Sequence, residues 1–406
     1  MNRLWLSPTL RSVAVYGAAG VGFAGANLIL ARVLPEHEYA VVTLVVALLN
    51  IGFFIAPAGL DGVVNRMHLE AGPRLLRRLL PPALATAGLF AAIGAGAYHT
   101  TPALTLLIFV GVLAGGALVV AAAQFQSEQR FGPSLALLQS TNIVLLLAAL
   151  VTLSTGNTAA ELPIVVLVAG TTAGAVWGWV VLFRERHAKP HRSVDIPWRD
   201  AFAFVGMQVS GLILIQLERL ILPHVRPMSD LATYGVLASV AGSLFRVLQM
   251  GVGYSLMPRL RRAPDLRARR RLVAKELRLV AAVVVLGSGA IAVVVPLVER
   301  WFLAGKYHLT AALVLATIVG GIAKIANAIT KAAATALASP RELSLANVSG
   351  WLTVGIAAAA AVVGARWGLA GVIYGVSLGW ALRAVVFSVI AIRHLRLPAG
   401  QPVKVP

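Results

Sequence analysis

The sequence contains no cysteine, which excludes disulfides and thiolate metal sites. Charge is also scarce, since only 12% of the 406 residues are Asp, Glu, Lys or Arg, against about 25% in soluble proteins. A GxxxxGK[ST] phosphate-binding loop and an HExxH zinc pair are both missing. We therefore expect no ATP hydrolysis by this chain alone, no catalytic residue, no cofactor and no metal.

What the sequence has instead is apolar residues, which make up 59% of the chain and give it a mean hydropathy of +0.84. They gather in twelve runs, each close to the roughly 20 residues that a membrane-spanning helix needs. The runs fall at about 12–34, 38–59, 79–98, 102–124, 133–154, 162–183, 200–222, 231–257, 276–298, 308–337, 343–364 and 368–392. We predict an all-α polytopic membrane protein with twelve transmembrane helices.

Basic residues outnumber acidic ones by 35 to 15, and the formal charge is +20. Such a balance can indicate nucleic-acid binding, but here the charges follow membrane topology. With a cytoplasmic N-terminus, 25 of the 35 Lys and Arg fall in cytoplasmic segments and five in outside segments. Nine of them lie between Arg259 and Arg278. We therefore predict that both termini are cytoplasmic, that anionic lipids contact this loop, and that nucleic acid is not a partner.

A polar segment from Arg184 to Arg199 separates six apolar runs from the next six. A short internal repeat supports this division, because Val33–Glu38 and Val225–Asp230 share the pattern V-x-P-x-x-acid at an offset of 192 residues. We predict an N-terminal half, 1–190, and a C-terminal half, 191–406. An even number of helices in each half makes the halves parallel pseudo-repeats, with the substrate in a central cavity between them.

Polar groups inside the apolar runs are the candidates for substrate binding, because a cation at a helix centre costs about 2.5–3.5 kcal/mol in a membrane. All five intramembrane cations belong to the C-terminal half. The candidates in this half are Arg246, Gln249, Lys324, Asn327, Lys331, Arg383, Gln208 and Gln216. Lys324, Asn327 and Lys331 share one stripe of the tenth helix, so one face of that helix is predicted to be polar and cationic.

Some of the polar residues in this half also have a structural alternative. Lys331 and Arg383 lie two to three turns from the cytoplasmic surface, so their long side chains can snorkel to it. Glu218 and Arg219 are adjacent near the outer end of the seventh helix, where a local structural role is the simpler interpretation. Arg246 and Lys324 lie near mid-depth, which favours a water-filled cavity that attracts anions.

The N-terminal half carries milder polar residues. Asn27 in the first helix and Asn50 in the second complete the substrate-binding candidates, although Asn side chains at membrane depth also join helices. Asp61, Asn65 and Arg66 cluster where the second run ends. We predict that these three form the cytoplasmic mouth of the cavity.

Several motifs carry a family resemblance. Leu30–Ala40 leaves the first helix as L-A-R-V-L-P-x-x-E-Y-A, and Ala58–Arg66 ends the second as A-G-L-D with a closing Arg. Leu217–Leu222 reads L-E-R-L-I-L, Leu231–Tyr234 reads L-A-T-Y, and Met257–Leu260 contains the Pro that closes the eighth helix. In these residues the sequence resembles the O-antigen and exopolysaccharide flippases of the multidrug/oligosaccharidyl-lipid/polysaccharide exporter superfamily.

The resemblance implies a non-enzymatic flippase of the bacterial inner membrane. Its cargo would be an oligosaccharide linked to a polyprenyl pyrophosphate, moved from the cytoplasmic to the outer leaflet for surface polysaccharides such as lipopolysaccharide. Membrane lipids and other polysaccharide-assembly membrane proteins are the expected partners. Two alternatives remain: a multidrug cation antiporter of the same superfamily, and a membrane-embedded glycosyltransferase or polymerase, which usually needs a longer outer loop than any in this chain.

Overall fold

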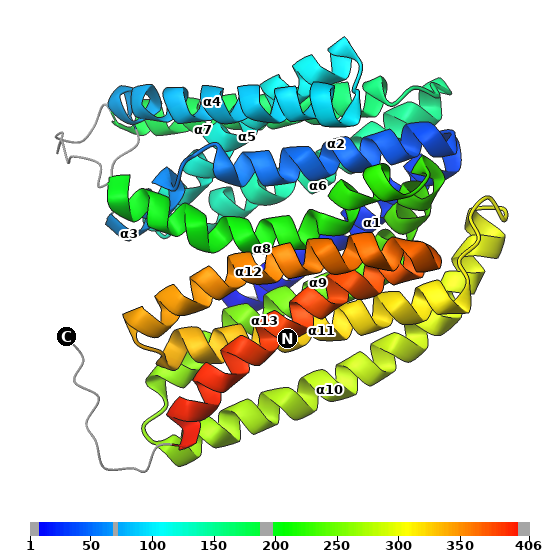
Figure 1. The fold of residues 1–406 in the computed structure, drawn as a ribbon. Coiled ribbons are helices and arrows are strands. Elements are labelled where there is room, and N and C mark those ends of the chain that lie inside the picture. Colours follow the sequence, from blue (N-terminus) through cyan, green and yellow to red (C-terminus); the bar gives the residue numbers. More distant parts are fainter. Residues whose placement is uncertain (1–7, 68–71, 187–197, 397–406) are drawn as a thin grey trace, which may run out of the picture. The chain divides into compact units, whose positions relative to one another are not determined.

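The computed structural model describes residues 8–67, 72–186 and 198–396 (Figure 1). Within these ranges the chain forms twelve α-helices of at least 20 residues and one short helix of 8 residues. The helices are α1 (Pro8–Val33), α2 (Glu36–Ile55), α3 (Leu60–Met67), α4 (Pro73–Tyr98), α5 (Pro102–Ser127), α6 (Phe131–Thr155), α7 (Glu161–Arg186), α8 (Trp198–Val225), α9 (Met228–Arg262), α10 (Leu266–Leu297), α11 (Ala311–Leu337), α12 (Pro340–Gly364) and α13 (Gly368–Arg396). Each long helix coincides with one predicted apolar run.

The surface of these helices is suited to lipid. Eight described segments are long and apolar enough to cross a membrane, and one of them, Arg341–Leu395, holds both α12 and α13. Large apolar side chains face outward along them, as Leu286 on α10 does at 74% exposure. A soluble protein rarely exposes so much contiguous apolar surface. The chain is therefore a multi-pass membrane protein with the predicted all-α architecture.

The second apolar run is interrupted, which the sequence reading missed. The run was expected to continue to residue 59, but α2 ends at Ile55, and Ala58 and Gly59 then adopt left-handed backbone angles, with φ of 50° and 81°. A Cβ on Gly59 would lie 2.6 Å from the carbonyl carbon of Ala201, so only glycine fits this turn. The short helix α3, which carries Asp61, begins directly after this turn.

By their contacts the residues divide into two compact units, Met1–Ser239, termed the N-unit, and Val240–Pro406, termed the C-unit. α8 and the first part of α9 therefore belong with α1–α7, although the sequence repeat assigns them to the C-terminal half. The predicted boundary at residue 190 falls in 187–197, outside the described residues, and stays a prediction.

In the N-unit, α5 packs against α2, α4 and α7, and α2 also packs against α8. Small residues permit the close contact of α5 with α2: a Cβ on Gly111 would lie 2.6 Å from the Leu49 side chain. Close approach at small residues is the usual way in which membrane helices associate. The α2–α8 contact brings together helices from the two repeats.

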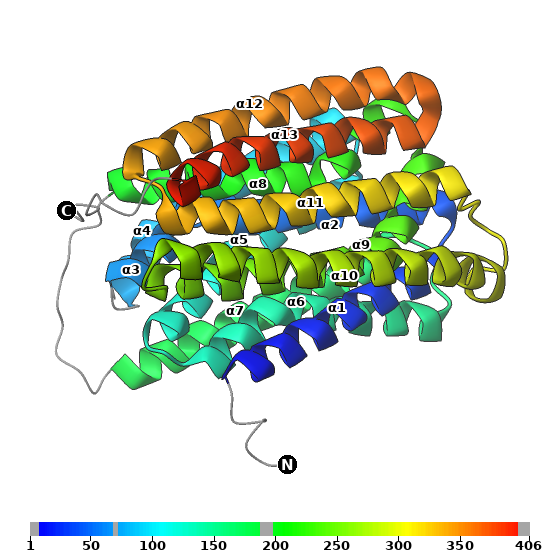
Figure 2. The ribbon, with the colours of Figure 1, turned by 90° about the horizontal axis from the view of Figure 1, so that it is seen from below.

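In the C-unit, α13 is the central helix and packs against α11 and α12, beside which it runs in Figures 1 and 2. The contact with α12 again depends on glycine, since a Cβ on Gly375 would lie 2.5 Å from the carbonyl carbon of Ala360. α13 therefore positions its side chains against two neighbours at once.

The predicted orientation in the membrane can be tested at two connections of the C-unit. Arg267 follows the α9–α10 connection, and Lys306 lies between α10 and α11. At Arg267 we expect the cytoplasmic reporter, a fluorescent protein, to be active and alkaline phosphatase to be inactive, because basic loops remain cytoplasmic. At Lys306 we expect the opposite result. Paired alkaline phosphatase and fluorescent-protein fusions measure this. Reversed signals at both positions would overturn the predicted orientation.

Candidate functional site

The predicted site residues fall into both units, and each unit is described by itself. In the N-unit are Asn27, Asn50, Asp61, Asn65, Arg66, Gln208 and Gln216, and in the C-unit are Arg246, Gln249, Lys324, Asn327, Lys331 and Arg383. The structure describes the helices of Arg66, Arg246 and Gln249, which are α3 and α9, but not these three side chains. Their roles stay predictions.

The C-unit brings cationic groups together from two helices. Arg383 of α13 is 3% exposed, and Lys331 of α11 lies near enough for the two like charges to repel each other. Asn327, one turn before Lys331, is also 3% exposed, and Lys324 one turn earlier is half-buried. We term Lys324, Asn327, Lys331 and Arg383 the α11–α13 cluster.

Close packing of α11 with α13 produces this cluster. A Cβ on Gly320 of α11 would lie 2.8 Å from the Ser377 hydroxyl oxygen of α13, so the two backbones approach closely two turns away from Arg383. The Arg383 guanidinium carbon lies 6.0 Å from the centre of the Phe387 ring, within the range of a cation–π contact. Arg383 is thus held inside the helix pair, and snorkelling, which remains open for the exposed Lys331, does not describe it.

Two uncharged groups beside these cations have unused hydrogen-bonding capacity. Asn327 Oδ1 of α11 and Trp380 Nε1 of α13 are buried and have no hydrogen-bond partner among the described residues. Buried polar atoms normally have partners, from the protein or from water. An acceptor on α11 and a donor on α13 can therefore serve water or a polar cargo.

The carboxylates of the C-unit make contacts near the ends of its helices. The unit contains four of them: Asp265, Glu276, Glu299 and Glu342. Asp265 caps α10, Glu276 pairs with Arg259 at 3.2 Å, Glu299 accepts from the Leu309 amide at 3.3 Å, and Glu342 contacts His394 at 2.8 Å. These contacts leave the middle of the α11–α13 pair positive, which suits an anion.

A second cluster of polar residues lies in the N-unit, where the α1–α2 hairpin meets the α8–α9 hairpin. The Tyr39 hydroxyl is 3.5 Å from Asn27 Oδ1 and faces the Thr43 and Ser239 side chains, and the Arg219 charge is close to it. Arg219 donates to Gln216 Oε1 at 2.7 Å, and Tyr234 is hydrogen-bonded to Glu218. We term Asn27, Tyr39, Gln216, Glu218, Arg219 and Tyr234 the hairpin cluster; all six are less than 9% exposed.

The other N-unit candidates are not part of this cluster. Gln208 is exposed on α8, and Asn50 is half-buried on α2. On α3, Asn65 is exposed while Asp61 is half-buried, and burial raises the pKa of the Asp61 carboxyl above its usual range. The predicted cytoplasmic mouth therefore contains one carboxyl group with a weakened tendency to ionise.

The sequence reading missed the tyrosines of the hairpin cluster and treated Glu218 and Arg219 as a local pair. A signal was present: Asn27 and Arg219 are 192 residues apart, the offset that relates the two V-x-P-x-x-acid segments. The structure places Asn27 in contact with the Tyr39 hydroxyl and the Arg219 charge close to Tyr39. The repeat-related polar positions were therefore a signal for this cluster.

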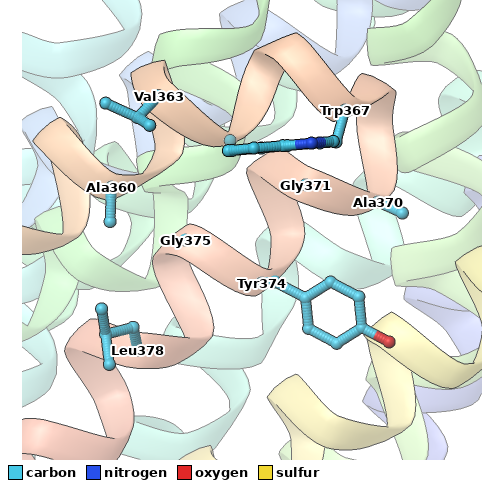
Figure 3. Close-up of a pocket in the computed structure, with 9 residues that line it drawn as sticks. Ala360, Val363, Trp367, Ala370, Gly371, Tyr374, Gly375 and Leu378 are labelled. Carbon is cyan, nitrogen blue, oxygen red and sulfur yellow. The ribbon is translucent and has the colours of Figure 1, made fainter.

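A pocket of about 450 Å³ lies between α12 and α13 in the C-unit (Figure 3). Its lining is formed by Ala360, Val363, Gly364, Trp367, Ala370, Gly371, Tyr374, Gly375 and Leu378. None of these nine side chains is charged, and Trp367 at its edge is 72% exposed. Exposed Trp is typical of the membrane interface, so this pocket suits hydrocarbon and not a charged headgroup.

Known structures share this fold. The inward-facing structure of a multidrug resistance MATE family transporter of the MOP superfamily aligns with a TM-score of 0.63 at 11% identity, over 93% of this chain and 94% of that chain. The lipid II flippase MurJ, in an inward closed conformation, aligns with a TM-score of 0.58 at 11% identity, over 94% and 90%. The eukaryotic MATE transporter AtDTX14 gives 0.56 at 14%, over 95% of both chains.

No protein-family model and no curated protein sequence matches the chain. The similarity to the solved structures confirms the predicted fold, and with it the fold expected from the superfamily resemblance. One fold serves several cargoes, so the cargo has to be argued from the two clusters.

Proposed function

We propose that this protein is a flippase that moves an oligosaccharide linked to a polyprenyl pyrophosphate from the cytoplasmic to the outer leaflet of a bacterial cell membrane. The observation that carries the proposal is the α11–α13 cluster, in which Arg383 is buried beside Lys331. The two like charges repel each other, and burial of the Arg383 charge at membrane depth is itself costly. A pyrophosphate between them would relieve both costs.

The geometry supports an anion on a lipid carrier. Arg guanidinium groups bind phosphate oxygens with two parallel hydrogen bonds, and Lys adds a point charge. Asn327 Oδ1 and Trp380 Nε1 offer an acceptor and a donor for sugar hydroxyls. The long apolar surfaces of the helices leave the polyprenyl tail in the bilayer while the headgroup crosses. The transport step breaks no bond, and we expect no enzymatic activity.

Flipping can be measured directly in proteoliposomes that contain the purified wild-type chain. The probe is a fluorescent sugar on a short polyprenyl diphosphate, and the control probe is the same sugar on a neutral polyprenol. We expect the diphosphate probe to exchange between leaflets at least tenfold faster than in protein-free vesicles, and the neutral probe to remain near that background. Equal rates for the two probes would contradict recognition of the pyrophosphate.

The multidrug cation antiporter remains the second candidate because of Glu218. This carboxylate lies seven residues before the end of α8, but it is only 2% exposed in the hairpin cluster, and proton or sodium coupling by a cation exporter needs a buried acidic group. Proteoliposomes with an imposed sodium or proton gradient distinguish the two functions. Extrusion of a lipophilic cationic dye, with no flipping of the diphosphate probe, would replace the flippase by the exporter.

A further inference from the structure

The pocket between α12 and α13 is a furrow with a floor of bare backbone. A Cβ on Gly364 at the end of α12 would lie 2.6 Å from the carbonyl carbon of Gly371 on α13, and one on Gly371 would lie 2.8 Å from that of Gly364. The two helices therefore touch through their main chains. We term Gly364, Gly371 and Gly375 the glycine floor, since they line the pocket without contributing side chains to fill it.

Larger apolar and aromatic side chains form the walls of this furrow. Figure 3 shows Val363, Trp367, Tyr374 and Leu378 arranged around the glycine floor. All four are exposed, so the furrow opens at the surface of the helix pair, where a membrane protein meets lipid. An empty furrow forfeits van der Waals contacts along its walls. A hydrocarbon chain that lies in it is therefore held better than one on a smooth helix surface.

The furrow has about the depth of one leaflet. Its lining on α13 extends from Ala370 to Leu378, eight residues apart, which is about 12 Å along the helix axis. One leaflet contributes about half of the roughly 30 Å hydrocarbon core of a bilayer. The furrow begins beside the α12–α13 connection, which the predicted topology places outside. One acyl chain of an outer-leaflet lipid can therefore lie along its full length.

A cation lies where the headgroup of such a lipid would be. Arg366 is in the α12–α13 connection, next to the lining residue Trp367. It is exposed and forms no ion pair among the described residues. No Asp or Glu follows Glu342 in the sequence, so neither α13 nor its connection to α12 carries a competing carboxylate. A guanidinium group in this position can bind phosphate oxygens, and the exposed Trp367 is typical of the headgroup level.

The furrow is separate from the α11–α13 cluster. Arg383 lies twelve residues after Gly371 on α13, which places it about 120° around the helix and about 18 Å further along its axis. Arg383 lies near Lys331 of α11, whereas the furrow is formed with α12. A lipid in the furrow therefore leaves the proposed pyrophosphate site free.

We infer that the furrow binds an anionic phospholipid, phosphatidylglycerol, with one acyl chain along the glycine floor and the phosphate at Arg366. Phosphatidylcholine binds less well, because its quaternary ammonium group is repelled by the arginine. A polyprenyl chain carries a methyl branch on each isoprene unit, so a straight acyl chain fits better between helices whose backbones touch. The inference goes beyond the proposed function and does not depend on it.

Trp367 can report the occupant directly, because bromine atoms on an acyl chain quench tryptophan fluorescence on contact. The purified chain is reconstituted in phosphatidylcholine vesicles in which a minor fraction of the lipid is brominated phosphatidylglycerol or brominated phosphatidylcholine. The chain has eight tryptophans, so the Trp367 signal is the difference between a protein and its Trp367→Phe counterpart. We expect brominated phosphatidylglycerol to quench this signal at least threefold more than the same fraction of brominated phosphatidylcholine.

Two variants separate the headgroup from the chain. Arg366→Gln should make the two brominated lipids quench equally, and Arg300→Gln is its control, because Arg300 is an exposed arginine that follows α10. Ala360→Leu should fill the furrow and reduce quenching by phosphatidylglycerol at least threefold, since Ala360 lines it. Its control is Ala359→Leu, because Ala359 is exposed on α12 and does not line the furrow.

Equal quenching by the two lipids in the wild type, a retained preference in Arg366→Gln, or undiminished quenching in Ala360→Leu would each overturn the phospholipid site. So would stronger relief of quenching by an added polyprenyl phosphate than by unbrominated phosphatidylglycerol, which would assign the furrow to the cargo lipid. Arg366→Gln changes no packed residue, so the test remains decisive if Ala360→Leu fails to fold. No readout involves flipping, so a failure of the proposed function leaves the site standing.

Discussion

An Arg383→Gln variant is expected to flip the polyprenyl-diphosphate probe at least thirtyfold more slowly than the wild-type protein. Arg383 is the most deeply buried cation of the α11–α13 cluster, at 3% exposure. Loss of one partner from a buried charge contact costs about 2 kcal/mol or more, and about 1.4 kcal/mol corresponds to a tenfold change. Glutamine is shorter than arginine, but it keeps hydrogen-bonding groups at its end and removes the charge.

The measurement is the initial flipping rate in proteoliposomes that contain equal amounts of folded protein. Arg393→Gln is the matched control, because Arg393 lies on the same helix, α13, but is exposed near its end. Arg383→Lys restores the charge without the planar guanidinium and should recover part of the rate. A rate for Arg383→Gln within twofold of wild type would show that the α11–α13 cluster does not bind the phosphates.

The fold could be predicted from the sequence because the membrane imposes simple rules. A chain in lipid must satisfy its own backbone hydrogen bonds, so each apolar run of about 20 residues becomes a helix. The runs at 102–124 and 368–392 correspond to α5 and α13 within a few residues. The break after Ile55 was missed, because hydropathy does not register the turn at Ala58 and Gly59.

The candidate site was predictable only in part. The spacing of Lys324, Asn327 and Lys331 identified one face of α11, since helical geometry relates residues three and four apart. That Arg383 lies near Lys331 could not be derived, because the sequence does not specify which helices are neighbours. The burial of Tyr39 and Tyr234 was missed for the same reason. Tyrosine is also common at membrane interfaces, where its side chain is exposed, so the residue type alone did not indicate burial.

Contacts between helices also explain why the compact units differ from the sequence halves. The sequence repeat places α8 and α9 in the second half, but α8 packs against α2 and α3 in the N-unit. The hairpins of the two sequence repeats touch at the hairpin cluster, where a Cβ on Gly235 of α9 would lie 2.9 Å from Thr43 Oγ1 of α2. The repeat predicts equivalent positions, whereas the conformation determines which of them are in contact.

A Gly375→Ala variant is expected to destabilise the C-unit by about 1–3 kcal/mol, the usual cost of overpacking a close contact. The added Cβ would lie 2.5 Å from the carbonyl carbon of Ala360, and backbone atoms cannot rotate away as a side chain can. α13 must then move away from α12. The measurement is the midpoint of unfolding of the detergent-purified protein, on heating or in sodium dodecyl sulfate.

Gly355→Ala is the matched control, because Gly355 lies on the exposed face of α12 and a Cβ there would meet nothing within 4 Å. Alanine favours helix by about 1 kcal/mol over glycine, so this control should be as stable as wild type or more stable. Equal midpoints for the two variants would show that α12 and α13 do not depend on this contact. Arg383 lies eight residues after Gly375 on α13, so a displaced α13 moves it relative to Lys331. We therefore expect slower flipping in Gly375→Ala, and unchanged flipping in Gly355→Ala.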